Sequence, residues 1–153
     1  MAIGNLKEYL NNQSVKYQCI AHARTVTTPR TAESTHISGK ELAKTVILKL
    51  DGEKVMAVLP ANRKVNLEDL QDVTGSDTVE MASEEEFTSL FPDCEVGAMP
   101  PFGNLYGMEV FVSAAFVNND NIAFNAGTHS EVIKMAFSDF MRLVEPKILD
   151  FAV

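Results

Sequence analysis

The chain has 153 residues, of which 46% are hydrophobic and 22% charged, a balance typical of globular domains that fold in water. No apolar run approaches the roughly 20 residues that cross a bilayer, and the N-terminus lacks the basic and apolar regions of a signal peptide. The two cysteines show no metal-ligand spacing, so we expect reduced thiols, no metal and a cytoplasmic location. We therefore expect one domain over residues 1–153.

Charge is distributed unevenly along the chain, whose net charge is −8. The first 64 residues hold ten Lys and Arg against five Asp and Glu, whereas the remaining 89 hold three against sixteen. The acidic total argues against nucleic acid covering the whole surface, but the basic portion could meet a phosphate-bearing partner over a small footprint. Chance asymmetry on a solvated surface is the alternative reading of the same counts.

The first quarter of the chain predicts three short elements. Apolar residues at helical spacing indicate a helix over residues 3–12. Alternating apolar residues indicate a strand over residues 15–22. The polar stretch 28–39 predicts one or two helical turns that end at Gly39.

The clearest local signal is a β-hairpin over residues 43–60. Two β-rich runs are joined by Asp51-Gly52, which is typical of a two-residue type I′ turn, because both central positions of that turn need positive φ. Pro60 should end the second strand. The turn also sets the register, so we expect Leu48 opposite Val55, Val46 opposite Ala57 and Lys44 opposite Leu59.

Two short helices should follow the hairpin. A helix over residues 67–73 is preceded by an Asn cap and followed by a glycine. A second helix over residues 83–91 begins with the Ser-x-x-Glu pattern of a capping box and should stop at Pro92. Further strands are expected at residues 77–82, 108–113 and 121–125.

The last segment, residues 130–144, allows two interpretations. Its apolar residues follow helical spacing, which by itself predicts one long helix. A strand to about residue 136, followed by a helix capped at Ser138, is the alternative. Strands and helices alternate without a strict βαβ rhythm, so we expect an α+β domain with a mixed or antiparallel sheet.

Lys44 is the first residue that could carry chemistry. Four of the five residues on its face of the strand are apolar, so that face should point toward the core. A lysine is costly to desolvate there unless it is paired. It could be a fixed cation at the mouth of a pocket, or a strand-end lysine that reaches water along its aliphatic stem.

Two other segments are candidates for a site. The stretch EVGAMPPFGNLYG, residues 95–107, is either a plain connector or a wall of backbone whose amides approach a ligand closely. In FNAGTHS, residues 124–130, His129 could hydrogen-bond a hydroxyl or be an ordinary surface histidine. Cys94 has acidic neighbours, which disfavour a thiolate nucleophile. The sequence has none of the common hydrolase, nucleotide-binding or zinc motifs.

Three stretches together resemble the YbaK/EbsC group of aminoacyl-tRNA editing domains, namely ELAKTVILKLDGEKVMAVLPANRKVNLEDL, GAMPPFG and FNAGTH. The similarity runs from about residue 15 to 145, with the motifs in the order typical of the group. The resemblance implies a single domain with a strongly curved, barrel-like mixed sheet of about six to seven strands, surrounded by helices. It also favours a strand followed by a helix in the last segment.

The resemblance further implies hydrolysis of the ester that joins a wrong amino acid to the 3′ end of a tRNA, without a cofactor or metal. The implied catalytic residues are Lys44, Gly97 and His129. The implied substrate-binding residues are Ala98, Met99, Pro100, Pro101, Phe102, Gly103, Asn125, Ala126, Gly127 and Thr128.

In the mechanism that this implies, Lys44 holds the terminal phosphate or ribose while loop amides polarise the ester carbonyl. The nucleophile is water or a substrate group such as the vicinal ribose hydroxyl. We expect the acceptor end of a mischarged tRNA as partner, with prolyl-tRNA synthetase as a further candidate and no membrane. Small amino acids such as Ala, Cys or Ser on tRNA for proline are the expected substrates. The alternative is a non-catalytic module that binds the aminoacyl-adenosine end, or a synthetase-associated regulator.

Overall fold

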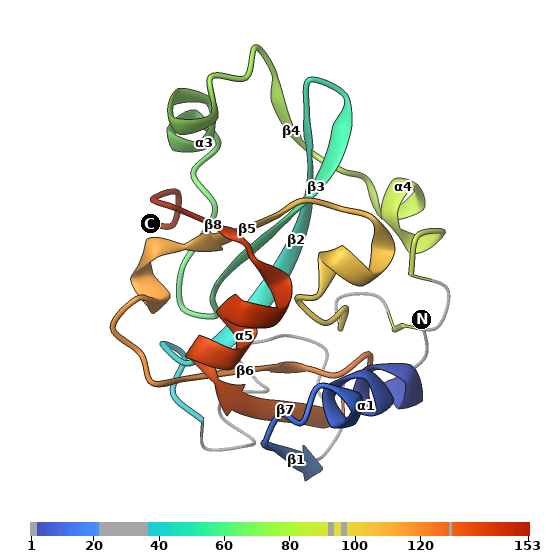
Figure 1. The fold of residues 1–153 in the computed structure, drawn as a ribbon. Helices are drawn as coiled ribbons and strands as arrows, with labels where there is room; N and C mark the ends of the chain where they lie inside the picture. Colours follow the sequence, from blue (N-terminus) through green and yellow to red (C-terminus); the bar gives the residue numbers. More distant parts are fainter. Residues whose placement is uncertain (1–2, 22–36, 92–93, 96–97, 129) are drawn as a thin grey trace.

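Eight strands form one mixed sheet in the structure, which is a computed structural model (Figure 1). The structure describes residues 3–21, 37–91, 94–95, 98–128 and 130–153. The strands are β1 (Tyr17–Ala21), β2 (Leu42–Leu50), β3 (Glu53–Pro60), β4 (Val79–Met81), β5 (Val110–Ser113), β6 (Asn121–Asn125), β7 (Glu131–Ala136) and β8 (Lys147–Leu149). The α-helices are α1 (Ile3–Asn12), α3 (Leu67–Thr74), α4 (Glu84–Thr88) and α5 (Phe137–Val144), and two 3-10 turns are η1 (Gly103–Tyr106) and η2 (Ala114–Phe116).

The sheet runs in the order β1-β7-β6-β2-β3-β5-β8, and β4 pairs separately with β2. Three neighbouring pairs are parallel, β2 with β6, β3 with β5 and β5 with β8, so the sheet is mixed as expected. In Figure 1 the β2–β3 hairpin rises through the molecule while β6, β7 and β1 lie across its lower part. The sheet is therefore strongly curved, but β1 and β8 remain at its two ends and the barrel is not closed.

The hairpin has the register that its turn residues predict. Asp51 and Gly52 have φ of 50° and 86°, the positive values that a type I′ turn requires. β3 ends at Pro60. The observed partners include Leu48 with Val55, Val46 with Ala57 and Lys44 with Leu59, so the predicted register is confirmed.

The caps of two helices are also confirmed. Asn66 accepts a hydrogen bond from the Asp69 amide (3.0 Å) at the start of α3, and Gly75 ends the helix with φ of 69°. Before α4, the Ser83 amide donates to Glu86 Oε1 (3.1 Å), and the Glu86 amide donates back to Ser83 Oγ (3.2 Å). α4 stops at Thr88, earlier than the prediction that it reaches Pro92.

Residues 131–144 form a strand and then a helix, which confirms the order that the family resemblance implies, whereas the single long helix that periodicity alone predicts is wrong. β7 pairs with β1 on one side and β6 on the other, and this double ladder outweighs the helical spacing of its apolar residues. The cap at Ser138 is wrong as well. The cap position of α5 is Ala136, without a side-chain hydrogen bond, and Ser138 lies exposed inside the helix.

The number of strands and the helical turns expected over residues 28–39 complete the comparison of the fold with the sequence. β8 was not expected, because its three residues follow Pro146 and are too short to show a period. It brings the sheet to eight strands instead of six or seven. The helical turns expected over 28–39 lie outside the described residues as far as residue 36.

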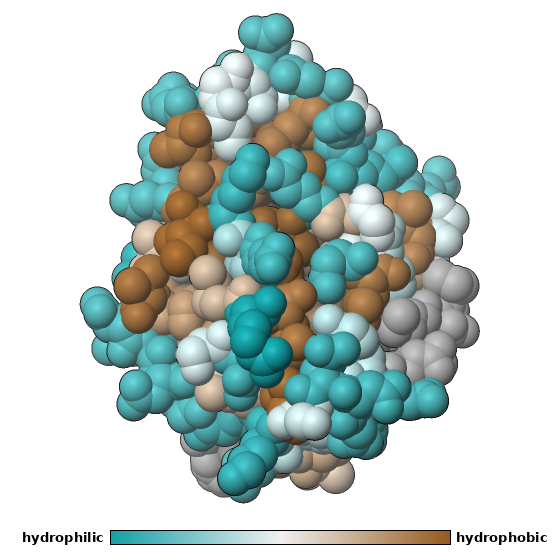
Figure 2. Space-filling model, in the orientation of Figure 1, coloured by the Kyte–Doolittle hydropathy of each residue, from teal (hydrophilic) through white to brown (hydrophobic). Residues whose placement is uncertain are grey.

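Both faces of the β2–β3 hairpin are buried. The largest core cluster contains Ile47 and Met56 together with helices α1 and α5, and the second contains Leu48 and Leu50 together with Leu70 of α3. On the surface, polar and apolar side chains are interspersed over the face seen in Figure 2. No helix within the described part of the chain is long and apolar enough to cross a membrane.

Candidate active site

The candidate site lies where β2 changes its partner strand. β3 pairs with one edge of β2 along nearly its whole length. The other edge pairs with β6 at Leu42 and Ala43 and with β4 at residues 48–50. Among the described strands, none pairs with residues 44–46 on this second edge. The sheet therefore opens at Lys44, between two buried stretches of the same strand.

Lys44 is a half-buried cation without a counterion among the described residues. It lies opposite Leu59, which is fully buried, and on the face of β2 that carries Leu42 and Leu48. Burial lowers the pKa of Lys44, and the nearby charge of Lys64 lowers it further. Both effects make the charged form of Lys44 less favourable than it is in water, and an approaching anion or polar oxygen would offset them.

Asn125 ends β6, one residue beyond the ladder that joins β6 to β2. The parallel register pairs Leu42 with Ala123 and Ala43 with Phe124, and Lys44 and Asn125 are the next residues of the two strands after the last pair. Asn125 is only 5% exposed. Its Oδ1 is buried and has no hydrogen-bond partner among the described residues. A cation and a buried amide oxygen, neither with a partner among the described residues, thus follow directly after the last β2–β6 pair.

The Gly/Pro loop and the third motif are joined by backbone hydrogen bonds. The Gly127 amide donates to the Ala98 carbonyl (2.9 Å), and the Glu95 amide donates to the Gly127 carbonyl (2.8 Å). Gly127 has φ of 93°, a conformation that favours glycine. The loop is therefore held against the end of β6, the strand that also carries Asn125.

The described loop residues, 98–103, are all buried, and packing explains two of them without a ligand. The Phe102 ring lies in the core, with its centroid 5.5 Å from that of Phe124 and 5.7 Å from that of Phe140. A Cβ on Gly103 would lie 2.8 Å from Val110 Cγ2, so the close approach of β5 requires glycine there. The loop can thus face a ligand with its backbone while its side chains pack inward.

The backbone amides of residues 98–101 differ in whether they can donate a hydrogen bond to a ligand. The Ala98 amide already donates to the Glu95 carbonyl (3.0 Å), so it cannot also serve an oxyanion well. Pro100 and Pro101 have no amide hydrogen. The Met99 amide has no acceptor among the described residues, so it is a donor that a ligand could use. Gly97 and His129, two of the three predicted catalytic residues, lie outside the described residues.

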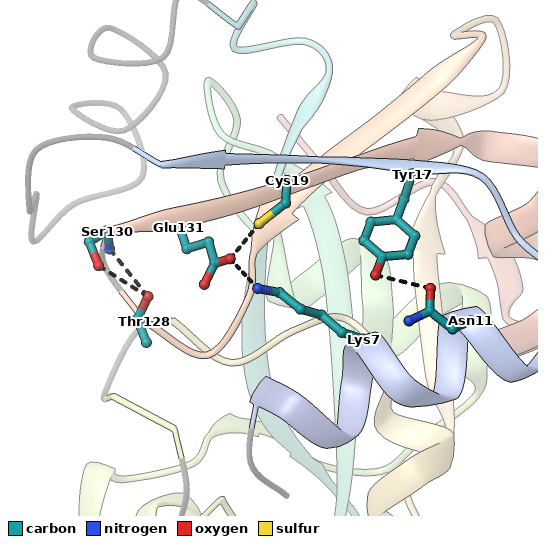
Figure 3. A network of polar contacts seen from close by, with 7 residues as sticks. All are labelled: Lys7, Asn11, Tyr17, Cys19, Thr128, Ser130 and Glu131. Carbon is teal, nitrogen blue, oxygen red and sulfur yellow. Dashed lines mark hydrogen bonds and ion pairs between the residues drawn. The ribbon is translucent and has the colours of Figure 1, made fainter.

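A polar network that sequence reasoning missed lies beside the third motif (Figure 3). Lys7 of α1 and Cys19 of β1 both donate to Glu131 Oε1 at the start of β7. Burial would raise the pKa of Glu131, but the two hydrogen bonds outweigh it and hold the pKa below its ordinary value. Glu131 follows directly after Ser130, whose amide donates to Thr128 Oγ1 (3.4 Å). No local signal could have revealed the network, because its members come from α1, β1 and β7 and meet only in the tertiary fold.

Two surface hollows lined by described residues lie away from Lys44, Asn125 and the Gly/Pro loop. One of about 550 Å³ is bounded by the hairpin tip, the end of α3 and β8. Another, of about 680 Å³, lies beside β1 and the start of α5. Within the described part of the chain, no three His, Cys, Asp or Glu side chains gather in a way that could hold a metal ion. The candidate site is therefore defined by the pairing and chemistry of its residues.

Comparison with known proteins gives this arrangement a context. Residues 22–143 match the family model of the aminoacyl-tRNA editing domain. The chain is 29% identical over 114 residues to the Escherichia coli (strain K12) multifunctional Ser/Thr-tRNA deacylase ProXp-y, covering 71% of this chain and 68% of that protein. It is 34% identical over 97 residues to a Bacillus cytotoxicus proline–tRNA ligase, covering 61% of this chain but 17% of the ligase.

Two solved structures share the fold. A hypothetical protein superposes with a TM-score of 0.86 at 17% identity, covering 97% of this chain and 99% of that one. A candidate trans-editing enzyme for prolyl-tRNA synthetase superposes with a TM-score of 0.83 at 13% identity, covering 99% and 96%. Together with the family model, these likenesses confirm the resemblance and the mixed fold that the three motifs predicted.

Proposed function

The chain belongs to the aminoacyl-tRNA editing domain family, and we propose that it is a deacylase that hydrolyses the ester of mischarged aminoacyl-tRNA. The observation that carries this proposal is Lys44, a half-buried lysine with no counterion among the described residues, at the opening of the sheet. An anionic or oxygen-rich substrate would supply the missing partner. The 3′ end of a tRNA offers phosphate, ribose and ester oxygens within a small footprint.

Lys44 would hold the terminal phosphate or the ribose of the 3′ adenosine. Lys64 lies close enough for its charge to act on Lys44, so two positive charges would meet the acceptor end. The acidic remainder of the chain would repel the rest of the RNA, because residues 65–153 carry sixteen acids and three Lys or Arg. Binding would then be weak, and delivery of the tRNA by prolyl-tRNA synthetase would help.

The ester would be polarised by backbone donors. The Met99 amide, which has no acceptor among the described residues, is one candidate, and Gly97 remains the predicted position of closest approach. Such donors stabilise the oxyanion without any nucleophilic side chain, and removing one typically costs 10²–10³ in rate. Water or the vicinal ribose hydroxyl would attack, with His129 orienting the aminoacyl end. Positioning and electrostatics would supply most of the catalysis.

The amino acid removed is part of the proposal. We expect a small one, Ala, Cys or Ser, carried on tRNA for proline. One relative is a Ser/Thr-tRNA deacylase and others are proline–tRNA ligases, which supports a small or hydroxyl-bearing amino acid and a link to proline decoding. No cofactor enters this mechanism, and we expect it to operate in the cytoplasm.

A deacylation panel tests the proposal. One tRNA would be charged with several amino acids, and hydrolysis by the wild type would be compared with that by Lys44→Ala and Gly97→Leu. We expect the wild type to release at least one small amino acid and both variants to be strongly impaired while still folded. Equal rates for wild type and Lys44→Ala would contradict the mechanism. Activity of Gly97→Leu would show that the loop is a plain connector.

A further inference from the structure

Three exposed cations, which we call the basic rim, lie on the segments that flank the open end of β2. Lys40 precedes β2, and Arg63 and Lys64 follow β3. None of the three has an ion-pair partner among the described residues. Five other cations of the described chain do have acidic partners, namely Lys7, Lys49, Lys134, Arg142 and Lys147. Positive charges that gather on one surface without acidic partners indicate an anionic ligand.

Backbone packing brings the two segments of the rim together. A Cβ built on Gly39 would lie 3.3 Å from the Cβ of Asn62, so the chain before β2 touches the chain after β3 at this point. Lys40 follows Gly39 in the sequence, and Arg63 follows Asn62. Two cations that are 23 positions apart in the chain are therefore carried by adjoining stretches of backbone.

Lys64 connects the rim to the candidate site. Its positive charge contributes to the lowered pKa of Lys44, which requires the two ammonium groups to be near one another. Two backbone hydrogen bonds with Val153, both of 2.8 Å, hold the main chain of Lys64 in place. The rim therefore begins close to Lys44 and extends from it along the segment that follows β3.

The segments that carry the rim contain little negative charge. Glu41 is the only acid in residues 37–44 and 60–66. Its carboxylate is already engaged, because Oε1 lies 3.3 Å from Lys134 Nζ of β7. The charges of the rim are thus not neutralised by acids of its own segments, and an anion that approaches would meet a net positive surface.

The other end of the hairpin has the opposite character. Asp51 and Glu53 are exposed at its tip, which lies at the top in Figure 1. Lys49 near the tip is neutralised by Glu86, with 2.8 Å between Nζ and Oε2. An RNA whose 3′ end reaches Lys44 would be repelled by the tip and attracted by the rim, so the charges along the hairpin favour one direction of approach.

We propose that the basic rim binds phosphates of the RNA backbone that precede the terminal adenosine, so that the acceptor end crosses the segments before β2 and after β3. This inference rests on the proposed deacylase function and adds the direction and the footprint of its RNA partner. Contacts to phosphate position a nucleic acid and supply salt-dependent affinity without reading its sequence. The rim would therefore act on binding of the RNA, while the ester is hydrolysed at Lys44.

A double variant with a matched control tests the rim. Lys40→Gln/Arg63→Gln removes two of its charges and keeps Lys64, whose charge acts on the pKa of Lys44. Lys16→Gln/Lys54→Gln removes the same total charge from two lysines that also lack ion-pair partners among the described residues. These control lysines lie before β1 and at the hairpin tip, away from the rim.

Binding is the deciding measurement, because it does not depend on catalysis. The probe is a fluorescent, uncharged RNA hairpin with the acceptor-stem sequence of tRNA for proline and its single-stranded CCA end, followed by anisotropy at several salt concentrations. At low salt we expect the Kd of the rim variant to rise by about tenfold. The slope of log K against log salt should become shallower by about 1.4, or about 0.7 for each lost phosphate contact. The control should stay within about twofold of the wild type.

Deacylation provides a second readout. On tRNA for proline charged with alanine or serine, the rim variant should lose about tenfold in kcat/KM, mainly through KM. On the corresponding 3′-aminoacyl-adenosine, the loss should shrink to less than about twofold, because this nucleoside ester has no phosphate for the rim to bind. Circular dichroism and thermal unfolding establish that both double variants are folded.

The outcomes separate this inference from the function on which it rests. A wild type that hydrolyses no ester would overturn the proposed function, whereas the binding measurement would still judge the rim. Equal Kd values and salt slopes for the rim variant and the control would overturn the inference, since the rim would then contribute only general charge or face another partner, such as an acidic protein. An equal loss on tRNA and on the nucleoside ester would also overturn it, because such a loss would be structural.

Discussion

The two ends of β2 differ in how many of their edges are paired and in whether their lysine has an ion partner among the described residues. At the hairpin end, residues 48–50 are paired on both edges, with β3 and with β4, and Leu48 and Leu50 are buried in one cluster. Lys49 at this end has its ion partner, with Nζ 2.8 Å from Glu86 Oε2. At the other end, Lys44 lies at an open strand edge with no such partner among the described residues, and Asn125 Oδ1, one residue past the β2–β6 ladder, is buried without a described partner.

The difference shows how one strand can be scaffold and site at once. The hairpin end satisfies its hydrogen bonds and charges within the fold, so it stabilises the protein whether or not a ligand is present. At the opposite end, no described residue pairs with the Lys44 ammonium or with the buried Asn125 Oδ1, and a buried polar atom without a partner costs stability. Two lysines five residues apart on one strand therefore have different physical tasks, and they can be compared directly.

The largest expected effect is on activity. Lys44→Ala should lower kcat/KM for deacylation by at least about 100-fold, because it removes the fixed cation of the site. Lys49→Ala, the matched lysine at the hairpin end, should stay within about twofold of the wild type, since its partner Glu86 lies at the hairpin end and not at the site. Steady-state deacylation at pH 7 measures both. Similar losses in the two variants would remove the functional distinction between the two ends.

For stability we expect the reverse order, with a larger loss from a substitution at the hairpin end than from one at Lys44. Leu48→Ala should lower the free energy of unfolding by about 2–5 kcal/mol, because it opens a cavity beneath a fully paired strand. Lys44→Ala should change it by less than about 1 kcal/mol, since the lost methylenes are offset by relief of an unpaired, partly buried charge. Denaturant unfolding of both variants measures the difference. A larger loss in Lys44→Ala would indicate that this lysine is structural.

A smaller effect is expected on the pH dependence of kcat/KM for deacylation. Lys44 has a pKa below its ordinary value, so its charge, and with it activity, should be lost as pH rises through that lowered value. Lys64→Gln removes one cause of the lowering and should move the alkaline limb of kcat/KM to higher pH. Lys54→Gln, at the hairpin end, should leave the limb in place. An unchanged limb in Lys64→Gln would mean that another group sets the alkaline limit.

The smallest effect concerns acid stability at the hairpin end. The ion pair with Lys49 and the capping bonds from Ser83 lower the pKa of Glu86 to about 2. A lowered folded-state pKa stabilises the protein above the unfolded value of 4.5, and this contribution is lost as pH falls toward about 2. Glu86→Gln should therefore lower Tm slightly at pH 7 and match the wild type near pH 2. Glu85→Gln, which lacks these contacts, is the control, and a Tm gap that persists at pH 2 would contradict the assignment.

The features that sequence analysis predicted correctly are governed by neighbouring residues. The Asp51-Gly52 turn sets its own φ values and the register of the strands beside it, and Asn66 and Ser83 cap the helices that follow them. The three motifs also identified the family, because each is a contiguous stretch. Such signals depend on local backbone torsions and hydrogen bonds, which a few adjacent side chains decide.

The sequence by itself thus determined the hairpin, the caps and the family. Only the tertiary structure decided the change of partner along β2, the position of β8 and the lack of a described partner for Asn125 Oδ1, and it confirmed the strand in residues 131–136 that the family resemblance favours over helical spacing. Each of these depends on contacts between segments far apart in the chain, where pairing and burial outweigh local periodicity. Whether a buried polar group finds a hydrogen-bond partner depends on the complete fold, because the fold determines every neighbour of that group.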